Sequence, residues 1–594
     1  MDGDIQFADM PISPRWGTDH FLFVGATGSG KTTLINILMK SVFQSRRHFR
    51  AMVYDPKQEV LPVLYGMLGE DDERAKSPSS RVKVLHPLDA RCCSWNLAAD
   101  IDGPVSARQL ATILIVDSGS ESGGDVFFNN AVRDLLTGVM LAFIECVPKE
   151  KAWTFRDVVL AMLYEPYLRW ILSFEVTRDG RPFPMLSRLR RSYLEGDPRT
   201  NSNIRASINA KMSIYEPIAA AWDLADKQKR TFSFKEWVRD SCADVLVLGN
   251  DEASRAALDA INQAMFKRAT ELLLAKAEAK EEVKRQGQNQ TWFFLDEVRE
   301  AGELDGLGRL MTKGRSKGAC VVLGFQDIDG LRSVYGEEVA HEICGQCNHI
   351  AVLRLNSPST ADWSVNLFGK RLARSKSQSR NMSTSGEADM GRTMGEDERP
   401  YVYTSNFLYL PQTSPETGLS GFYKSPNLDP EQHELFAHLP WGTVAGLLPR
   451  KTDLPSVVEV AAFSRVAELP LNIARAAFLA RPPAEHFLRV WDKADWEQFG
   501  YKEPFNDFLV IEAEKIRKTL HASEEAAALQ NLEKAHKVKE IRFREEEREW
   551  RRQEWLWKLR DRQSKEEQAA TDEGKDGSRL KQILEAFQKK GKGT

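Results

Sequence analysis

The stretch FLFVGATGSGKTTLINILM, from Phe21 to Met39, decides the fold of the first half of the chain. Its first four residues are apolar and predict a buried strand, while the apolar spacing near its end predicts a helix. The glycines between them fit G-x-x-x-x-G-K-[ST], a loop whose backbone N–H groups and following helix N-terminus surround phosphate oxygens. We therefore expect a nucleotide to bind here. The residues expected to form this loop are Gly25, Ala26, Thr27, Gly28, Ser29, Gly30, Lys31, Thr32 and Thr33.

Two side chains of this loop carry specific chemistry. Lys31 can reach the β- and γ-phosphates of the nucleotide, and the hydroxyl of Thr32 can ligate Mg²⁺. A glycine-rich turn between a strand and a helix is the alternative interpretation. The agreement of strand, loop, Lys-Thr pair and helix favours nucleotide binding.

The composition describes a large protein with real cores and no bulk charge signal. The chain has 594 residues, 42% of them hydrophobic, and a formal net charge of −3. Any nucleic-acid surface must therefore be local. Seven scattered cysteines without a secretory signal suit a reducing cytosol. The longest apolar run, 135–147, falls short of the roughly 18–20 residues of a membrane helix, so we expect a buried helix and a soluble protein.

Short apolar runs that alternate with helical patterns predict an α/β domain with a mostly parallel sheet. After the first loop, the predicted strands are AMVYDPKQE (51–59), RVKVLHP (81–87), ADVLVLGN (243–250), TWFFLDE (291–297), ACVVLGFQD (319–327) and HIAVLRL (349–355). Residues 153–230 show helical spacing instead, which predicts an all-helical insertion. Residues 370–400 are rich in Ser, Gly and charge, so we expect a mobile loop there.

The predicted strand WFFLDE ends in two carboxylates, Asp296 and Glu297. Ligands of parallel sheets bind at the carboxyl ends of the strands. We expect Asp296 to hold Mg²⁺ together with Thr32, and Glu297 to orient and activate the attacking water for hydrolysis. An apolar strand ending in Asp-Glu is common by itself, but together with the phosphate loop it is a strong signal.

Two further polar residues are candidates for catalysis. Arg315, in GRSKG (314–318), is either a solvated turn residue or an arginine finger that reaches a neighbouring subunit's phosphates. Gln326 follows the strand VVLGF and can sense the γ-phosphate, although it can also be an ordinary polar residue at a strand end.

The segment HEICGQCNHI (341–350) resembles a metal site because it contains His341, Cys344, Cys347 and His349. One C-x-x-C pair with nearby histidines lacks the second half of a usual zinc site. Structural packing ahead of the following strand is the favoured interpretation.

Charged helical segments form the rest of the chain. The helical insertion carries basic residues that either form a solvated face or contact a partner: Arg188, Arg190, Arg191, Arg205 and Lys211. The tail from 505 has too few apolar residues for its own core. It offers two apolar faces instead, on either side of a break at Gly574 and Gly577. Their residues are Phe543, Trp550 and Trp557 in the first, and Ile583, Leu584 and Phe587 in the second. A coiled coil or solvated helix is the alternative to partner docking.

The ordered set of motifs resembles the type IV coupling proteins of conjugation and type IV secretion, the TraD/TrwB group. The matching pieces, over about residues 1–450, are DHFLFVGATGSGKTT, VYDPKQE, the helical insertion, FSFKEWVRDSCADVLVLGNDE, FFLDE, GRSKG, LGFQDIDGLRSVYG and VLRLNSPSTADW. Lys31 and Thr32 match the family's Walker A positions, Asp296 and Glu297 its Walker B positions. Arg315 and Gln326 match its finger candidate and its glutamine sensor.

This resemblance implies a RecA-like P-loop NTPase that uses ATP and Mg²⁺ and assembles as a hexameric ring. It implies that hydrolysis moves DNA, or a DNA-linked relaxase or other secreted protein, into a channel with its own ATPases and inner-membrane components. The expected parts are a nucleotide-binding domain in two pieces (1–152 and 231–465), the all-alpha domain (153–230), a connecting region (466–504) and the helical tail (505–594).

The sequence departs from the family pattern because no pair of membrane helices precedes the phosphate loop. A separate anchor subunit, a trimmed chain or a naturally soluble member would each account for this, with a cytoplasmic location, peripheral at the inner membrane. Two other functions stay open from the sequence. One is a DNA pump of the FtsK/HerA kind in segregation, repair or defence. The other is a substrate-recruiting adaptor controlled by nucleotide, although an adaptor does not need Glu297.

Overall fold

The computed structural model describes most of the first 448 residues and a short segment near 490. The described residues are 5–45, 49–57, 59–70, 79–87, 89, 91–116, 123–148, 153–239, 244–250, 255–277, 289–382, 388–426, 435–448, 488–489 and 491–499. The predicted docking faces of the tail, and most of the predicted connecting region, lie outside these ranges. The chain divides into the units Met1–Ala513 and Glu514–Thr594, and the description below concerns the first unit.

A nine-stranded sheet forms the framework of this unit, in the order β15-β14-β11-β3-β10-β9-β4-β8-β5. Seven neighbouring strands, from β11 to β5, run parallel, and β14 and β15 add antiparallel pairs at one edge. The bounds are β3 Phe21–Val24, β4 Phe49–Asp55, β5 Val82–Val84, β8 Val245–Gly249, β9 Gln290–Leu295, β10 Ala319–Phe325, β11 His349–Val352, β14 Leu419–Lys424 and β15 Phe436–Leu439. The predicted α/β class with a mostly parallel sheet is confirmed.

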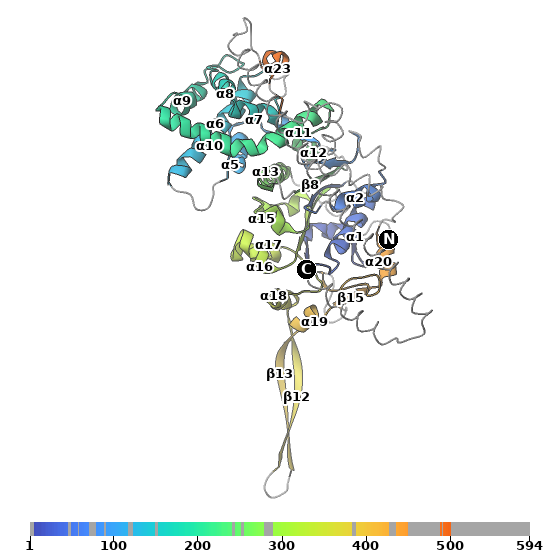
Figure 1. Cartoon of the computed structure of the whole chain (residues 1–594). Helices are drawn as coiled ribbons and strands as arrows, with labels where there is room; N and C mark the ends of the chain where they lie inside the picture. Colours follow the sequence, from blue (N-terminus) through green and yellow to red (C-terminus); the bar gives the residue numbers. More distant parts are fainter. Residues whose placement is uncertain are drawn as a thin grey trace, which may run out of the picture. The chain divides into compact units, whose positions relative to one another are not determined.

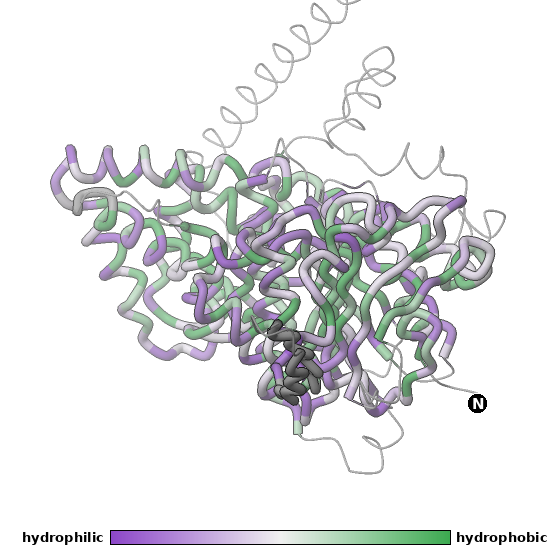
Figure 2. The backbone as a smooth tube through the Cα atoms, turned by 90° about the horizontal axis from the view of Figure 1, so that it is seen from below, coloured by the Kyte–Doolittle hydropathy of each residue, from purple (hydrophilic) through white to green (hydrophobic). Residues whose placement is uncertain are grey.

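Helices cover both faces of the sheet because its central strands are apolar throughout. On one face, Phe43 of α1 packs edge-on against Phe294, whereas Phe266 of α13 packs against Phe293, the preceding residue of β9. Successive strand residues point to opposite faces, so α1 and α13 lie on opposite sides (Figure 1). Figure 2 shows hydrophobic segments alternating with hydrophilic ones along the described backbone. These helices are α1 Lys31–Gln44, α2 Val60–Leu68 and α20 Trp441–Leu447 on the first side, and α13 Arg255–Leu274, α15 Leu307–Lys313, α16 Ile328–Tyr335 and α17 Glu337–Gly345 on the other.

The predicted helical insertion is present and extends beyond its predicted start. Its helices are α7 Phe155–Leu163, α8 Glu165–Ile171, α9 Pro184–Leu194, α10 Pro198–Met212 and α11 Glu216–Lys227. The long helix α6, Gly123–Glu145, packs against α7, α9 and α10, and α5, Pro104–Leu114, packs against α6. We call α5–α11 the helical cluster. Residues upstream of 153 therefore contribute to it, because the apolar α6 supplies the surface that the other helices cover.

Helix α6 is the one helix in the described part of the chain that is long and apolar enough to cross a membrane. The apolar segment is Val126–Glu145, and 72% of its most apolar part is buried inside the protein. Core helices of water-soluble proteins have the same length and composition. The expected buried helix is therefore what the structure contains.

Residues 370–400 differ from the sequence-based expectation of a mobile loop. They form two long antiparallel strands, β12 Lys370–Met382 and β13 Ala388–Pro400, with continuous pairing from Lys370↔Pro400 to Met382↔Ala388 (Figure 1). A two-stranded ladder depends on backbone hydrogen bonds, which a Ser- and Gly-rich composition does not exclude. The composition therefore indicated a polar segment correctly but not its structure.

Short elements complete the description. They are β1 Ile5–Phe7, β2 Met10–Ile12, β6 Ser94–Trp95, α4 Leu97–Asp100, β7 Thr231–Phe232, α12 Phe234–Arg239, α18 Pro358–Phe368, α19 Thr404–Leu408 and α23 Lys493–Gln498. The last of these lies in the predicted connecting region. Trp496 of this helix and the preceding Trp491 are buried against Tyr167 of α8, so this segment is part of the helical cluster's core.

Candidate nucleotide-binding site

The phosphate loop lies between β3 and α1, as the sequence predicts. Gly28 and Gly30 have φ values of 76° and 88°, the left-handed region in which residues with a Cβ are strained. A Cβ on Gly25 would collide with the hydroxyl of Ser29. These positions therefore require glycine, and the loop leads directly into the N-terminus of α1, where backbone N–H groups favour a phosphate group.

Lys31, Thr32 and Asp296 converge at this loop. The ammonium of Lys31 forms an ion pair with Oδ1 of Asp296, and its Nζ lies 3.2 Å from Oε1 of Glu297. The Thr32 hydroxyl donates to Oδ2 of Asp296 at 2.6 Å. The Lys31 side chain is only 5% exposed, so the two carboxylates balance a buried positive charge.

Three side chains contact Glu297: Lys31, Lys57 and Gln326. Gln326 donates its side-chain amide to Oε1 of Glu297 at 2.8 Å, and Lys57 Nζ lies 3.3 Å from the same oxygen. Thr27 of the phosphate loop donates to the amide oxygen of Gln326 at 3.1 Å. Glu297 itself has φ 55° and ψ 50°, an uncommon conformation for a residue other than glycine. Such strain is often found at functional sites.

The parallel sheet explains why these residues meet. Strands β3, β10 and β9 are neighbours, with Phe325 paired to Val24 and Leu323 paired to Leu295. The residues that follow these strands therefore emerge at one edge of the sheet: the phosphate loop, Gln326, and the pair Asp296-Glu297. Gly324 of β10 lets the Asp296 side chain lie directly against this strand, because a Cβ at position 324 would collide with Asp296.

Sequence reasoning missed Lys57 as a site residue. Burial lowers the pKa of Lys57, but the charge of Glu297 and the hydrogen bond to it raise that pKa above its usual value. Lys57 follows β4, the strand next to β9, so the strand-end rule that found Asp296 would also have found Lys57.

Arg315 does not join this group. It precedes β10 in a short 3₁₀ turn, Arg315–Lys317, whereas Gln326 follows the same strand. Seven strand residues separate the two ends by about 20 Å. The Arg315 side chain is 41% exposed and forms an ion pair with the buried Asp19, which precedes β3. Arg315 thus lies at the opposite edge of the sheet from the phosphate loop of its own chain.

The oxygen donors of the site suit a nucleotide with Mg²⁺. The Thr32 hydroxyl and the Asp296 carboxylate lie together beside the phosphate loop, and oxygen ligands of this kind are those that Mg²⁺ prefers. The Ser29 hydroxyl is buried in the loop without a hydrogen-bond partner in the protein. These observations fit a phosphate-bound cation held partly by protein and partly by ligand oxygens.

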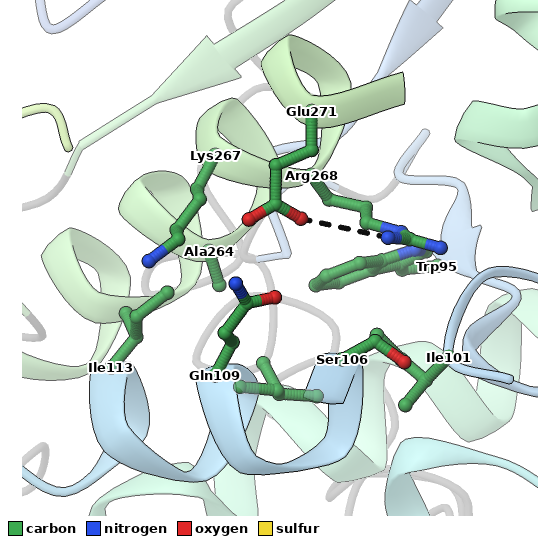
Figure 3. Close-up of a pocket in the computed structure, with 10 residues that line it drawn as sticks. Trp95, Ile101, Ser106, Gln109, Ile113, Ala264, Lys267, Arg268 and Glu271 are labelled. Atoms are coloured by element: carbon green, nitrogen blue, oxygen red, sulfur yellow. Dashed lines mark ion pairs between the residues drawn. The ribbon is translucent and has the colours of Figure 1, made fainter. Parts of the chain in front are cut away.

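Other candidate sites are weaker. His349 is buried, with its ring nitrogens 3.0 Å from the Ser425 hydroxyl and 3.1 Å from the Trp16 carbonyl oxygen, and its ring stacks on Phe21. Within the described ranges, no three His, Cys, Asp or Glu residues group as metal ligands would. A cavity of about 20 Å³ lies between α5 and α13. Figure 3 shows its lining side chains, among them the ion pair of Arg268 and Glu271. This volume suits about one water molecule and not a nucleotide.

A family model and two curated proteins that match this chain all describe conjugation or type IV secretion proteins. A family model described as the type IV secretion-system coupling protein DNA-binding domain matches residues 4–420. The coupling protein TraD of Escherichia coli (strain K12) is 23% identical over 380 residues, which are 62% of this chain and 46% of TraD. The probable conjugal transfer protein TraG of Sinorhizobium fredii is 22% identical over 384 residues, 63% of this chain and 56% of TraG. The chain thus spans about half the length of the curated relatives it matches.

Solved structures share the fold. The unbound bacterial conjugative coupling protein TrwBdeltaN70 aligns with a TM-score of 0.53 and 19% identity, over 76% of this chain and 92% of that chain. TrwB in complex with the non-hydrolysable analogue ADPNP aligns with a TM-score of 0.52 and 18% identity, over 77% and 92%. TrwB with ADP and Mg²⁺ gives 0.52 and 17%, over 77% and 92%. Because the family model covers well over half of its residues, the chain belongs to the type IV secretion-system coupling protein family.

Proposed function

We propose that this protein is a coupling ATPase, which uses ATP hydrolysis to recruit DNA or a DNA–relaxase complex and to translocate it into a type IV secretion channel. One observation carries the proposal: Lys31, Asp296, Glu297 and Gln326 meet at the carboxyl ends of the neighbouring strands β3, β9 and β10. A protein that only bound nucleotide would use Asp296 for Mg²⁺ but would not need a second, water-activating carboxylate such as Glu297. The TrwB structures with ADPNP, with ADP and Mg²⁺ and with the GTP analogue GDPNP support a purine nucleotide with Mg²⁺ at this loop, and we propose ATP as that nucleotide.

The residues of the site divide the chemistry among them. Lys31 binds the β- and γ-phosphates and balances charge on the transferred phosphoryl group. Glu297 accepts a proton from the attacking water, and its contacts with Gln326 and Lys57 hold its carboxylate in place. Thr32 and Asp296 would hold Mg²⁺, which would supply further charge neutralisation on the phosphate oxygens when bound. Gln326 bridges Glu297 and Thr27, so it can report the presence of the γ-phosphate to both.

Arg315 acts across a subunit boundary in this proposal. Its exposure, and its place at the far edge of the sheet from its own phosphate loop, suit a residue that completes a neighbour's site. A ring of subunits, for which the family suggests a hexamer, would supply such neighbours. The protein would work in the cytoplasm, peripherally at the inner membrane.

DNA binding must come from local surfaces, because the net charge is only −3. The family description names a DNA-binding domain. The exposed residues Arg188 and Arg191 of α9 supply local positive charge in the helical cluster, whereas Arg205 of α10 is exposed but paired with Glu165. Contacts of this kind go to phosphates, so they give binding with little sequence preference.

ATP hydrolysis measured with and without single- and double-stranded DNA tests the proposal. We expect DNA to stimulate hydrolysis and the stimulation to fall steeply as salt rises from about 50 to 200 mM. Lys31→Ala is the matched control and should abolish both basal and stimulated rates. Hydrolysis that does not respond to DNA, or a stimulation that is equal at both salt concentrations, would contradict the proposal.

A further inference from the structure

The segment from Tyr409 to Gly418 lies against the phosphate loop, although nothing in the hydrolysis site requires it. It connects α19 with β14. The hydroxyl of Thr413 donates to the backbone carbonyl of Ser29 at 2.7 Å. A Cβ on Gly28 would lie 2.8 Å from Nε2 of Gln412, and a Cβ on Gly30 would lie 2.8 Å from Oγ1 of Thr413. Gly28 and Gly30 of the phosphate loop therefore both face this segment.

The segment is held in a defined shape. Gly418 donates its N–H to the carbonyl of Ser414 at 2.9 Å, and the Ser414 hydroxyl accepts the N–H groups of Glu416 and Thr417. The Thr417 hydroxyl donates to the carbonyl of Gln412. Leu410 is buried, so the chain is also fixed on the near side of Gln412. Gln412 is thus exposed on a rigid turn beside the phosphate loop.

Tyr409 presents a large aromatic surface close to this turn. Its side chain is 85% exposed, the highest value among the large hydrophobic residues that the structure describes. Its N–H closes the end of α19 on the carbonyl of Ser405, so its backbone is fixed. Three residues of extended chain span at most about 10 Å, so Tyr409 lies within the reach of a ribose and a base from Gln412.

We propose that Tyr409 and Gln412 form the nucleoside half of the ATP site, in which the Tyr409 ring stacks on the base and the Gln412 amide contacts the ribose. Aromatic stacking is favourable for any base, because every base has a π-face. The phosphate loop itself reads only phosphates, so the nucleoside needs a separate contact of this kind. The inference rests on the proposed function, since it assumes that ATP occupies the phosphate loop.

Two probes separate the halves of the site in the full-length protein. ATP contains phosphates and a nucleoside, whereas inorganic tripolyphosphate contains phosphates only. We expect Tyr409→Ala to weaken ATP binding roughly tenfold and to leave tripolyphosphate binding unchanged. Tyr409→Phe keeps the ring and should bind ATP as the wild type does. Gln412→Ala should weaken ATP binding by a smaller factor, again without effect on tripolyphosphate.

Tyr403 provides the matched control. It is 49% exposed and lies at the other end of α19, so Tyr403→Ala should not alter binding of either probe. Wild-type ATP affinity in Tyr409→Ala would overturn the inference alone, as would an equal loss of ATP and tripolyphosphate. A wild-type chain that binds ATP no more tightly than Lys31→Ala does would overturn the proposed function and this inference together.

Discussion

At the scale of single residues, His20 shows how a buried polar group is fixed at the edge of the sheet opposite the site. Its Nδ1 accepts the N–H of Val321 at 3.1 Å, and its Nε2 donates to the carbonyl of Met311 at 2.8 Å. Both nitrogens are therefore used by the neutral ring, with the proton on Nε2. Burial lowers the pKa of His20 to about 4, although the contact with Met311 opposes the shift. Protonation of Nδ1 would remove the acceptor of the Val321 N–H and leave a positive charge buried in the protein.

This environment predicts a specific pH dependence of stability. The folded-state pKa lies below the ordinary value of 6.5, so the stabilisation is present above pH 6.5 and is lost as pH falls towards 4. We expect the free energy of unfolding to fall by about 3 kcal/mol more in the wild type than in His20→Asn between pH 7 and 4. Urea denaturation of both proteins at a series of pH values measures this. Parallel pH profiles would show that His20 is not buried as a neutral ring.

At the scale of elements, the segment around α23 is joined to the helical cluster by a buried network. Arg156 of α7 contacts Asp157, Asp223 and Asp495, with Nη2 of Arg156 2.9 Å from Oδ1 of Asp495. Trp491 donates its indole N–H to Asp157 at 2.9 Å and stacks on Tyr167 at 4.5 Å. The described residues that precede the tail are thus anchored on the helical cluster.

Loss of one carboxylate from this network should loosen the anchor. We expect Asp495→Ala to lower the free energy of unfolding by about 1–3 kcal/mol, below the usual cost of an unpaired buried charge because Asp157 and Asp223 remain with Arg156. Glu497→Ala, on the exposed side of the same helix, should change it by less than about 0.5 kcal/mol. Chemical denaturation monitored by tryptophan fluorescence compares them. Equal effects of the two variants would contradict the anchor.

Comparison of elements also shows what the sequence can predict. The strands around the phosphate loop were predictable because each is a short apolar run that ends in a chemically distinctive residue. Their meeting at one edge followed from the parallel class. The contact of Thr413 with Ser29 was not predictable, because 384 positions separate the two residues and no motif marks Thr413. The pairing of β12 with β13 was not predicted for another reason. It depends on backbone hydrogen bonds, and the side-chain pattern of these residues does not indicate it.

At the scale of the whole molecule, the proposed motor needs more than one chain. Arg315 and the phosphate loop lie at opposite ends of the strands, so one chain cannot bring them together. A second chain, placed with its Arg315 edge at the first chain's site, would. The tail from 505 would then select cargo through its two predicted apolar faces. A separate surface is needed because contacts with phosphates do not distinguish one DNA sequence from another.

Mixing variants tests the subunit boundary. Arg315→Ala should bind ATP normally but hydrolyse it about 10³-fold more slowly, the scale of a missing arginine finger. Adding Lys31→Ala protein, itself inactive, should restore part of the activity, because its Arg315 can complete the intact phosphate loop of Arg315→Ala. Steady-state hydrolysis over a range of protein concentrations measures both effects. A fully active Arg315→Ala protein, or rates per chain that do not depend on concentration, would exclude this arrangement.

Deletion of residues 505–594 tests cargo selection separately from the motor. We expect near-normal ATP hydrolysis and DNA binding, because every residue of the described site precedes the tail. Capture of the relaxase or secreted partner, and transfer through the channel, should be lost. The measurements are hydrolysis, DNA affinity and partner pull-down on the same preparation. Loss of hydrolysis upon deletion would instead make the tail part of the motor.

The most direct test of the account is a comparison of ATP binding and ATP hydrolysis in the wild type, Glu297→Gln and Glu300→Gln. Glu300 lies in the turn that follows Glu297 and pairs with Arg255 at 2.8 Å, so it is a matched neighbour outside the site. The account predicts that Glu297→Gln binds ATP with nearly wild-type affinity and hydrolyses it about 10²-fold more slowly or worse, while Glu300→Gln behaves as the wild type. Hydrolysis by Glu297→Gln at the wild-type rate would contradict it.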